Sequence, residues 1–257
     1  MLHAVVIGIN CYVHPRFPDL RSARADAQVV AGRLLQSIVP PDRNVNLLVD
    51  QQATRSGIIK AIGEALPRHQ SREDLILIYF AGHGSPEQRA PPDRISRYLV
   101  PYDADYDHIF ATGVGFETDV VELLERQLAG RVLFIIDSCF SGRAGGRSIF
   151  GPHLQRRLSQ LRAPLSLREL ELGFGKAILS ACRDDELAQE RNDHGIFTRN
   201  LIDALSREGP PTVGVGDVYE QVFDAVVRDT SQRQHPVFRG HIEGMRLPRL
   251  LTKSGGE

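Results

Sequence analysis

Two residues able to perform nucleophilic chemistry each follow a run of apolar residues. His83 lies in the segment AGHGS, directly after LILIYF, and Cys139 lies in DSCFSG, directly after VLFII. A thiolate is a strong nucleophile, but a free thiol with a pKa of about 8.5 is mostly protonated at neutral pH. A nearby imidazole can take up the proton and later return it to a leaving amine. His83 and Cys139, which are 56 residues apart in the sequence, are therefore candidates for covalent catalysis.

The elements that must position these two residues are predicted to be buried parallel strands. Apolar runs that do not alternate with polar residues occur at 4–9, 45–49, 75–80, 132–136 and 177–181, and the run at 45–49 is the weakest. Such runs are typical of strands covered by helices on both faces. Amphipathic helices are predicted around them, for example over 27–38, 58–66 and 197–205. The pattern indicates a doubly wound α/β domain, in which ligand sites lie beyond the carboxyl ends of the strands.

Two stretches interrupt this pattern. Residues 85–115 are rich in Pro, Asp and Gly, and we expect a small β excursion there. Residues 141–168 contain no acid but several arginines, namely Arg143, Arg147, Arg156, Arg157, Arg162 and Arg168. A segment of this length between two buried strands is usually a functional or mobile loop. A nucleic-acid patch is the alternative, although Phe150 is the only aromatic residue interleaved there.

Composition limits the class of protein. The 257 residues carry a net charge of −1, which argues against a chain built to coat nucleic acid or an anionic membrane. No run approaches the roughly 20 apolar residues of a membrane span, and the N-terminus does not resemble a signal peptide. The three cysteines are widely spaced, which predicts a reduced, cytoplasmic protein without a disulfide framework. Cys11 and Cys182 are interpreted as structural, and no zinc-binding motif is present.

Several motifs together resemble one peptidase family. They are AVVIGIN at 4–10, LRSARADA at 20–27, YFAGHGS at 79–85, FIIDSCFSG at 134–142, and ILSACRDDELAQE followed by HGIFT at 194–198. In this order they resemble a caspase-like cysteine peptidase of the metacaspase, bacterial type (peptidase family C14, clan CD). The resemblance implies a three-layer sandwich, with a mostly parallel sheet of about six strands and helices on both faces.

The resemblance also implies roles for individual residues. Cys139 would be the nucleophile and His83 the general base and acid. The backbone N–H groups of Gly84 and Cys139 would form the oxyanion hole. Asp26 and Asp137 would line a specificity pocket for Arg or Lys, since a pair of carboxylates suits a guanidinium. Two alternatives stay open: Asp26 could simply favour a helix N-terminus, and Asp137 could only cap the turn.

The sequence departs from the family pattern at two positions and leaves calcium dependence open. Ala23 stands where many metacaspases have Cys, and Ala81 where they often have Ser. Calcium-dependent members carry an Asp cluster, for which Asp103, Asp105 and Asp107 are the only candidates with a DxDxD spacing. They do not match an EF-hand and fit a polar turn. We therefore expect no cofactor and no metal site, and lean against activation by calcium.

These observations lead to one functional expectation and one alternative. The chain is expected to be a single peptidase domain over 1–257, with a large-subunit-like part (1–140), a processing loop (141–175) and a small-subunit-like part (176–257). It would cut protein or peptide substrates after Arg, and possibly after Lys, and cleave itself at Arg143, Arg147, Arg156, Arg157 or Arg162. By the resemblance to metacaspases it would be a monomer. The alternative is a latent or vestigial caspase-fold interaction module that needs a partner or an ion.

Overall fold

A computed structural model of the chain describes residues 1–38, 41–66, 74–89, 94–122, 131–140, 147, 175–183, 185–191, 193–241 and 243–251. Its centre is a six-stranded sheet with the strand order β12-β8-β7-β3-β1-β2. The strands are β1 (Leu2–Gly8), β2 (Arg43–Val49), β3 (Leu75–Ala81), β7 (Arg131–Asp137), β8 (Lys176–Ser180) and β12 (Val237–Gly240). All neighbours are parallel except β12, which runs antiparallel to β8. The expected mostly parallel sheet is confirmed, and each predicted apolar run forms a strand.

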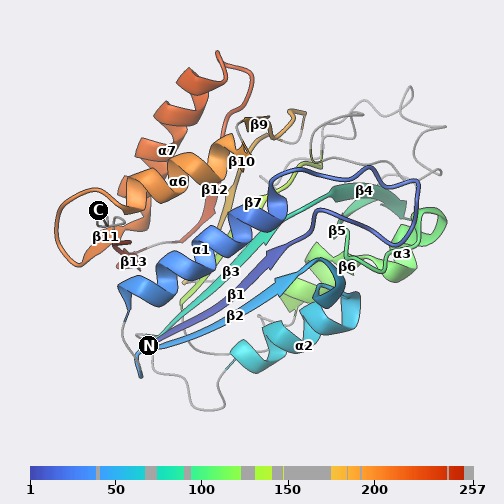
Figure 1. Ribbon diagram of the computed structural model, residues 1–257, viewed down its shortest axis with the longest axis horizontal. Helices are drawn as coiled ribbons and strands as arrows, with labels where there is room; N and C mark the ends of the chain where they lie inside the picture. Colours follow the sequence, from blue (N-terminus) through green and yellow to red (C-terminus); the bar gives the residue numbers. More distant parts are fainter. Residues whose placement is uncertain are drawn as a thin grey trace, which may run out of the picture.

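Helices cover both faces of the sheet (Figure 1). On one face lie α1 (Ala23–Ser37), α6 (Ile196–Leu205) and α7 (Val215–Asp229). On the other lie α2 (Arg55–Ala65), whose N-terminus is capped by the Thr54 side chain, and η3 (Phe116–Val121). Strand residues alternate between the faces: Ala4 and Val6 pack in the core on the α1 side, and Val5 and Ile7 in the core on the α2 side. The chain therefore folds as a three-layer sandwich with two apolar layers.

Smaller elements lie near the ends of the strands. An antiparallel sheet of β4 (Gly84–Arg89), β5 (Arg94–Leu99) and β6 (Val114–Gly115) follows β3 and is the expected β excursion (Figure 1). Two short helical turns, η2 (Tyr106–His108) and α3 (Ile109–Thr112), connect β5 to β6, and another, η1 (Asp50–Gln52), connects β2 to α2. Two further antiparallel pairs complete the description: β9 (Glu190–Arg191) with β10 (His194–Gly195), and β11 (Thr212–Gly214) with β13 (Arg246–Pro248).

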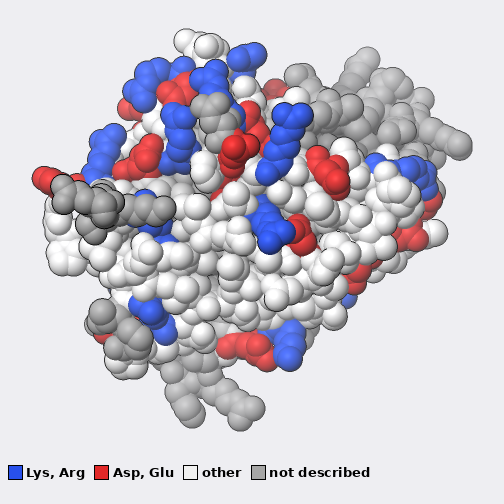
Figure 2. Space-filling model, viewed as in Figure 1, with Lys and Arg blue, Asp and Glu red and all other residues white. Residues whose placement is uncertain are grey.

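The surface carries charges of both signs. On the face drawn in Figure 2, Lys and Arg side chains are mixed with Asp and Glu over α1, α6 and α7. This mixture agrees with the balanced composition of the chain. Across the described residues, no helix combines the length and the apolar character that crossing a bilayer requires.

Candidate active site

The strand register brings His83 and Cys139 to the same edge of the sheet. Ala81, the last residue of β3, is the register partner of Asp137, the last residue of β7. His83 and Cys139 each lie two residues beyond this pair. Both side chains are buried. Because the strands are parallel neighbours, both residues emerge beyond the carboxyl end of the sheet, where ligand sites of α/β proteins are found.

The His83 ring is fixed so that one nitrogen remains available as a base. Its Nε2 lies 2.7 Å from the carbonyl oxygen of Pro18. A carbonyl can only accept a hydrogen bond, so Nε2 carries the proton and Nδ1 has the free lone pair. Nδ1 is buried and forms no hydrogen bond within the described part of the chain. Burial lowers the pKa of His83 to about 4, so the ring is neutral at pH 7. Tyr12 packs beside this ring and accepts the backbone N–H of His83.

Two backbone N–H groups at this edge point at one carbonyl oxygen. Gly84 and Cys139 both donate to the carbonyl of Arg147, with N···O distances of 3.0 and 3.3 Å. Residue 84 must be glycine for this approach, because a Cβ there would lie 2.5 Å from the Cys139 carbonyl oxygen and 2.6 Å from Ser138 Oγ.

The side chain of Arg147 is fully buried among carboxylates. We call Asp26, Asp137 and Glu190 the acidic cluster. Arg147 Nη2 lies 2.6 Å from Asp26 Oδ2 and 3.3 Å from Glu190 Oε1, and Nη1 lies 2.8 Å from Asp137 Oδ2. Nη1 also donates to the Asp137 carbonyl and Nη2 to Ser22 Oγ, both at 2.9 Å. These contacts use both ends of the planar guanidinium, a geometry that an ammonium group cannot reproduce.

Charges in the acidic cluster strongly perturb one another. Burial would lower the pKa of Arg147, but Asp137 and Asp26 outweigh it and raise that pKa. Burial, which Arg147 only partly offsets, and the nearby Asp26 charge raise the pKa of Asp137. Burial also opposes the ionisation of Glu190, yet hydrogen bonds from Ser22 and the Arg147 charge lower its pKa. The cluster thus holds buried negative charge that a cation must compensate.

Neighbouring groups orient the acidic cluster. Asp26 accepts hydrogen bonds from the Gly195 N–H and pairs with His194 Nδ1, both at 2.9 Å. Asp137 Oδ2 accepts from Thr198 Oγ1 at 2.5 Å. A Cβ at Gly195 would lie 2.7 Å from Asp137 Oδ2 and 3.0 Å from Arg147 Nη2. The segment HGIFT therefore forms one wall of the cluster, where a side chain at residue 195 would meet both the carboxylates and the guanidinium.

A second thiol adjoins Cys139. Cys182, two residues beyond β8, has its Sγ 3.0 Å from Cys139 Sγ, and both side chains are buried. The Ala188 N–H also points at Cys139 Sγ. The sequence-based interpretation of Cys182 as a structural residue did not anticipate this contact.

The structure brings some predicted site residues together and leaves others apart. Cys139, His83, Gly84, Asp26, Asp137 and Arg147 share one region. The remaining cleavage candidates, Arg143, Arg156, Arg157 and Arg162, lie outside the described residues. Glu190, Ser22 and Gly195 were missed as site residues. Their signal was present, since Ser22 lies in LRSARADA, Gly195 in HGIFT and Glu190 at the end of ILSACRDDELAQE, but the sequence does not show that these three segments meet around one guanidinium.

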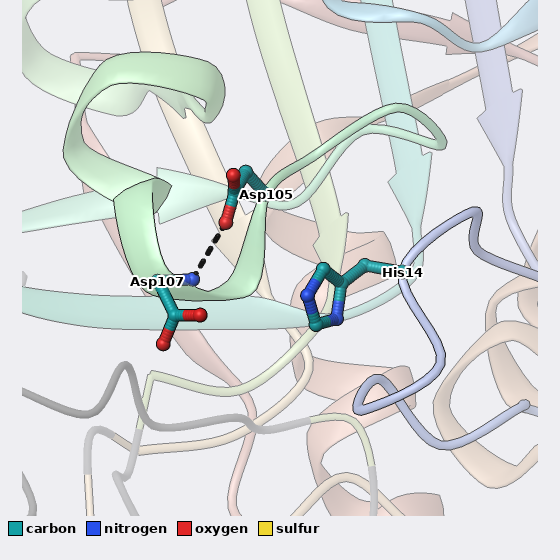
Figure 3. A group of neighbouring side chains, drawn as sticks. All are labelled: His14, Asp105 and Asp107. Carbon is teal, nitrogen blue, oxygen red and sulfur yellow. Dashed lines mark hydrogen bonds between the residues drawn. The ribbon is translucent and has the colours of Figure 1, made fainter.

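The three aspartates of the DxDxD segment do not converge. Asp105 and Asp107 lie with His14 in a group whose ligand atoms are within 4.8 Å of one another (Figure 3). Asp107 is paired with Arg16, and Asp105 with His108 and the Asp107 N–H. Asp103 instead accepts the backbone N–H of Arg55 at the start of α2. Protein cations and N–H groups therefore already compensate these carboxylates.

The fold and the grouping of thiol, imidazole and paired N–H donors define a caspase-type α/β sandwich. The family model of the caspase domain (Peptidase_C14) matches residues 1–244, and the chain belongs to this family. Among solved structures, it is similar to that of protein GSU0716 from Geobacter sulfurreducens, with a TM-score of 0.67 and 20% identity over 93% of each chain. At that identity the likeness concerns the fold. The chain has no match among curated proteins.

Proposed function

We propose that this protein is a cysteine endopeptidase that hydrolyses peptide bonds after arginine. The observation that carries the proposal is the binding of Arg147. Its carbonyl oxygen accepts from the N–H groups of Gly84 and Cys139 while its guanidinium lies in the acidic cluster. A substrate arginine on the amino side of a cut bond would make the same contacts. The caspase domain family supports the coarser class of cysteine peptidase.

In the proposed reaction Cys139 is the nucleophile and His83 moves the proton. His83 Nδ1 takes the proton from the Cys139 thiol, and the sulfur attacks the carbonyl carbon. The N–H groups of Gly84 and Cys139 stabilise the oxyanion, and one such donor is typically worth about 3–4 kcal/mol. His83 then protonates the leaving amine, which leaves a thioester on Cys139. Water, activated by His83, hydrolyses the thioester and restores the thiol.

The proposed preference follows from charge and shape. A substrate acid would meet like charges in the acidic cluster, so peptides ending in Asp should not be cut. Lysine would supply a single ammonium, whereas the partners of Arg147 Nη1 and Nη2 match the forked guanidinium. We therefore rank Arg above Lys.

We further propose that the chain cleaves itself at the Arg147–Ser148 bond. Of the five candidate arginines, Arg147 is the one within the described residues, and its contacts are those of a bound substrate. While that bond is intact, Arg147 excludes other substrates, so the uncut chain would be latent. The latent uncut chain agrees with the alternative expectation of a latent caspase-fold module, and it retains the catalytic groups.

The first test measures cleavage of fluorogenic peptides ending in Arg, Lys or Asp. Wild type is compared with Cys139→Ala, and with Cys11→Ala as a control for an exposed thiol. We expect Arg cleavage that disappears in Cys139→Ala and persists in Cys11→Ala. Equal Arg cleavage by Cys139→Ala would refute the proposal. No cleavage of any peptide by wild type that has been cut after Arg147 would favour an interaction module.

The same assay is run with calcium and with a chelator. Asp105 and Asp107 already pair with His108 and Arg16, so we expect equal rates in both conditions. A rate that depends on calcium would contradict this expectation without affecting the assignment of Cys139.

The self-cleavage proposal is tested by intact mass spectrometry. The wild-type chain should yield pieces that end at Arg147 and begin at Ser148. Arg147→Ala should remain uncut at this position, and Arg143→Ala serves as the matched control. A fragment boundary that is the same in Arg147→Ala and wild type would overturn the assignment of the bond.

A further inference from the structure

Next to Cys139 lies a thiol that the proposed reaction does not use. The Sγ atoms of Cys139 and Cys182 are 3.0 Å apart. A covalent S–S bond measures about 2.05 Å, so the sulfurs need to approach by only about 1 Å to be joined. Both are free thiols in this structure, and both are buried. The third cysteine, Cys11, is exposed and takes no part in this contact.

The two thiols are held together by the rigid part of the fold. Ile136 of β7 is the register partner of Ser180 of β8, and the two cysteines follow these strands. The Ala181 N–H donates to the Ile136 carbonyl and extends the ladder beyond the strands. Both strands lie in the middle of the sheet and are almost fully buried. The pairing of β7 with β8 therefore brings the two segments that carry the thiols together.

The surroundings give the two sulfurs different roles. Cys139 Sγ receives the Ala188 N–H, a donor that stabilises negative charge on this sulfur. Cys182 Sγ has two backbone carbonyls at 3.7–3.8 Å, those of Glu186 and Ser138, which can only accept a hydrogen bond from the thiol. The hydrogen bond with Cys139, followed by burial, raises the pKa of the Cys182 thiol well above its ordinary value. Cys182 thus remains a protonated thiol beside the sulfur that reacts first.

We propose that Cys182 is a resolving cysteine that converts an oxidised Cys139 into a disulfide. The thiolate of Cys139 attacks a hydroperoxide: the O–O bond breaks, an S–O bond forms, and the peroxide is reduced to water or an alcohol. The Cys182 sulfur then attacks Cys139, the S–S bond forms, and the hydroxyl group leaves as water with the Cys182 proton. A dithiol reductant reverses the change by thiol–disulfide exchange. The inference rests on the proposed function, because it takes Cys139 as the reactive thiol.

The expected consequence is reversible inactivation of the peptidase. While the disulfide persists, Cys139 has no free thiol for attack on a substrate. It is also protected from further oxidation to sulfinic acid, which ordinary thiols do not reverse. Without Cys182, oxidation would continue to that irreversible product. The pair would therefore let the chain lose and regain activity as peroxide levels change.

The test follows both the bond and the activity. Wild type, Cys182→Ser and Cys182→Ala are treated with hydrogen peroxide, and half of each sample then receives dithiothreitol. Peptide mapping without reduction should find a Cys139–Cys182 linked peptide in wild type, with the mass of two hydrogen atoms lost. Wild type should regain most of its own starting activity, whereas both variants should stay inactive and carry sulfinic or sulfonic acid at Cys139.

The outcomes separate this inference from the proposed function. The Arg147 carbonyl is seated on the Cys139 N–H while the guanidinium lies in the acidic cluster, so the mapping is repeated on Arg147→Ala, in which the guanidinium no longer anchors this segment beside Cys139. The absence of the linked peptide from both wild type and Arg147→Ala would overturn the inference, even if the peptidase is active. Equal recovery by the Cys182 variants would also overturn it. A linked peptide in a chain without peptidase activity would support the cysteine pair and contradict the proposed function.

Discussion

At the scale of single residues, the main feature is the buried charge around Arg147. Asp26 and Asp137 are almost fully buried and Glu190 is largely so, with the side chain of Glu190 at 20% exposure. Buried carboxylates without a cation are strongly unfavourable, and removing one partner of a buried pair is usually costly. The buried charge of the acidic cluster therefore requires a cation, and its contacts with Arg147 match the forked shape of a guanidinium.

The first prediction concerns these acids. Asp26→Asn and Asp137→Asn should each lower kcat/KM for Arg peptides by about 10- to 100-fold, because each removes a charged hydrogen bond to the guanidinium. Glu190→Gln should have a smaller effect, since its contacts with Arg147 are longer, at 3.3–3.4 Å. The exposed Glu64→Gln is the matched control. Steady-state kinetics check this ranking, which unchanged rates in both Asn variants would contradict.

The second prediction concerns the neutral, buried His83. Its pKa is about 4 in the folded chain against an ordinary value of 6.5, so the unfolded chain binds the extra proton first as the pH falls. The contribution of neutral His83 to the free energy of unfolding is fully present above about pH 6.5, and it is lost as the pH falls from about 6.5 to 4. The loss amounts to about 3 kcal/mol.

Urea denaturation at several pH values measures this effect. The Cys139→Ala background prevents self-cleavage, and His83→Gln is compared with His83 in that background. Relative to the His83→Gln chain, the chain with His83 should lose about 3 kcal/mol of unfolding free energy between pH 7 and pH 4. A difference that does not vary with pH would mean that the imidazole does not titrate in this way.

Sequence patterns predicted the candidate reactive residues, but not every residue that contacts the Arg147 guanidinium. His83, Cys139, Asp26 and Asp137 stand beside strand ends or in recognisable motifs. Glu190 joins the acidic cluster only because β9 pairs with β10 and carries it back toward α1. Such contacts depend on how a short hairpin packs, which residue spacing does not encode. The proximity of Cys182 to Cys139 could have been found once β7 and β8 were taken as parallel neighbours.

At the scale of elements, the packing of α1 on β1 controls the position of Asp26. Gly8, at the end of β1, lies so close to α1 that a Cβ would meet the Ala23 carbonyl oxygen and Ala27 Cβ, each at 2.5 Å. Asp26 belongs to the first turn of that helix. Any displacement of α1 would therefore move one of the carboxylates that hold the guanidinium.

The third prediction tests this packing with two glycines. Gly8→Ala should destabilise the fold by about 1–3 kcal/mol through overpacking and raise KM for Arg peptides. Gly32→Ala, within α1, meets no atom within 4 Å and is the matched control. It should stabilise the fold by up to about 0.5–1 kcal/mol through helix propensity and leave KM unchanged. Thermal unfolding and kinetics check both variants, and equal effects would contradict the argument.

Elements were predicted well where burial imposes a simple pattern. The apolar runs of β1, β3, β7 and β8 are covered on both faces, so their residues are almost continuously apolar. β12 was missed because it is a short strand at the edge of the sheet, with residues VFRG that are only partly buried. An edge strand need not be apolar on both faces, and its pairing with β8 is a long-range contact that leaves no local signal.

At the scale of the whole molecule, the proposed cut falls between two strands that pair in the same sheet. β7 precedes Arg147 and β8 follows it, and they are parallel neighbours from Val132 and Lys176 to Ile136 and Ser180. The core on the α1 side also combines residues from α1 with residues from α6 and α7. The cut therefore removes a connection in the chain but none of these contacts.

The fourth prediction is that the two pieces remain associated. After complete self-cleavage, size-exclusion chromatography under native conditions should give one peak with the size of a single chain. Denaturing electrophoresis of that peak should separate two fragments, and uncut Arg147→Ala should elute at the same volume. Elution of the pieces in separate peaks would show that the shared sheet is insufficient. A peak of twice the size would contradict the expectation of a monomer.

The tethering of Arg147 also affects the kinetics of activation. Because this arginine is attached to the domain that binds it, its effective concentration is set by the connecting chain and can reach about the millimolar range. Dilution of the protein does not change this effective concentration. Soluble peptides at micromolar concentration compete poorly against such a ligand. Activity should thus rise exponentially with a half-time that is the same at every enzyme concentration, as for a first-order intramolecular step. The chain would time its own activation independently of how much of it is present.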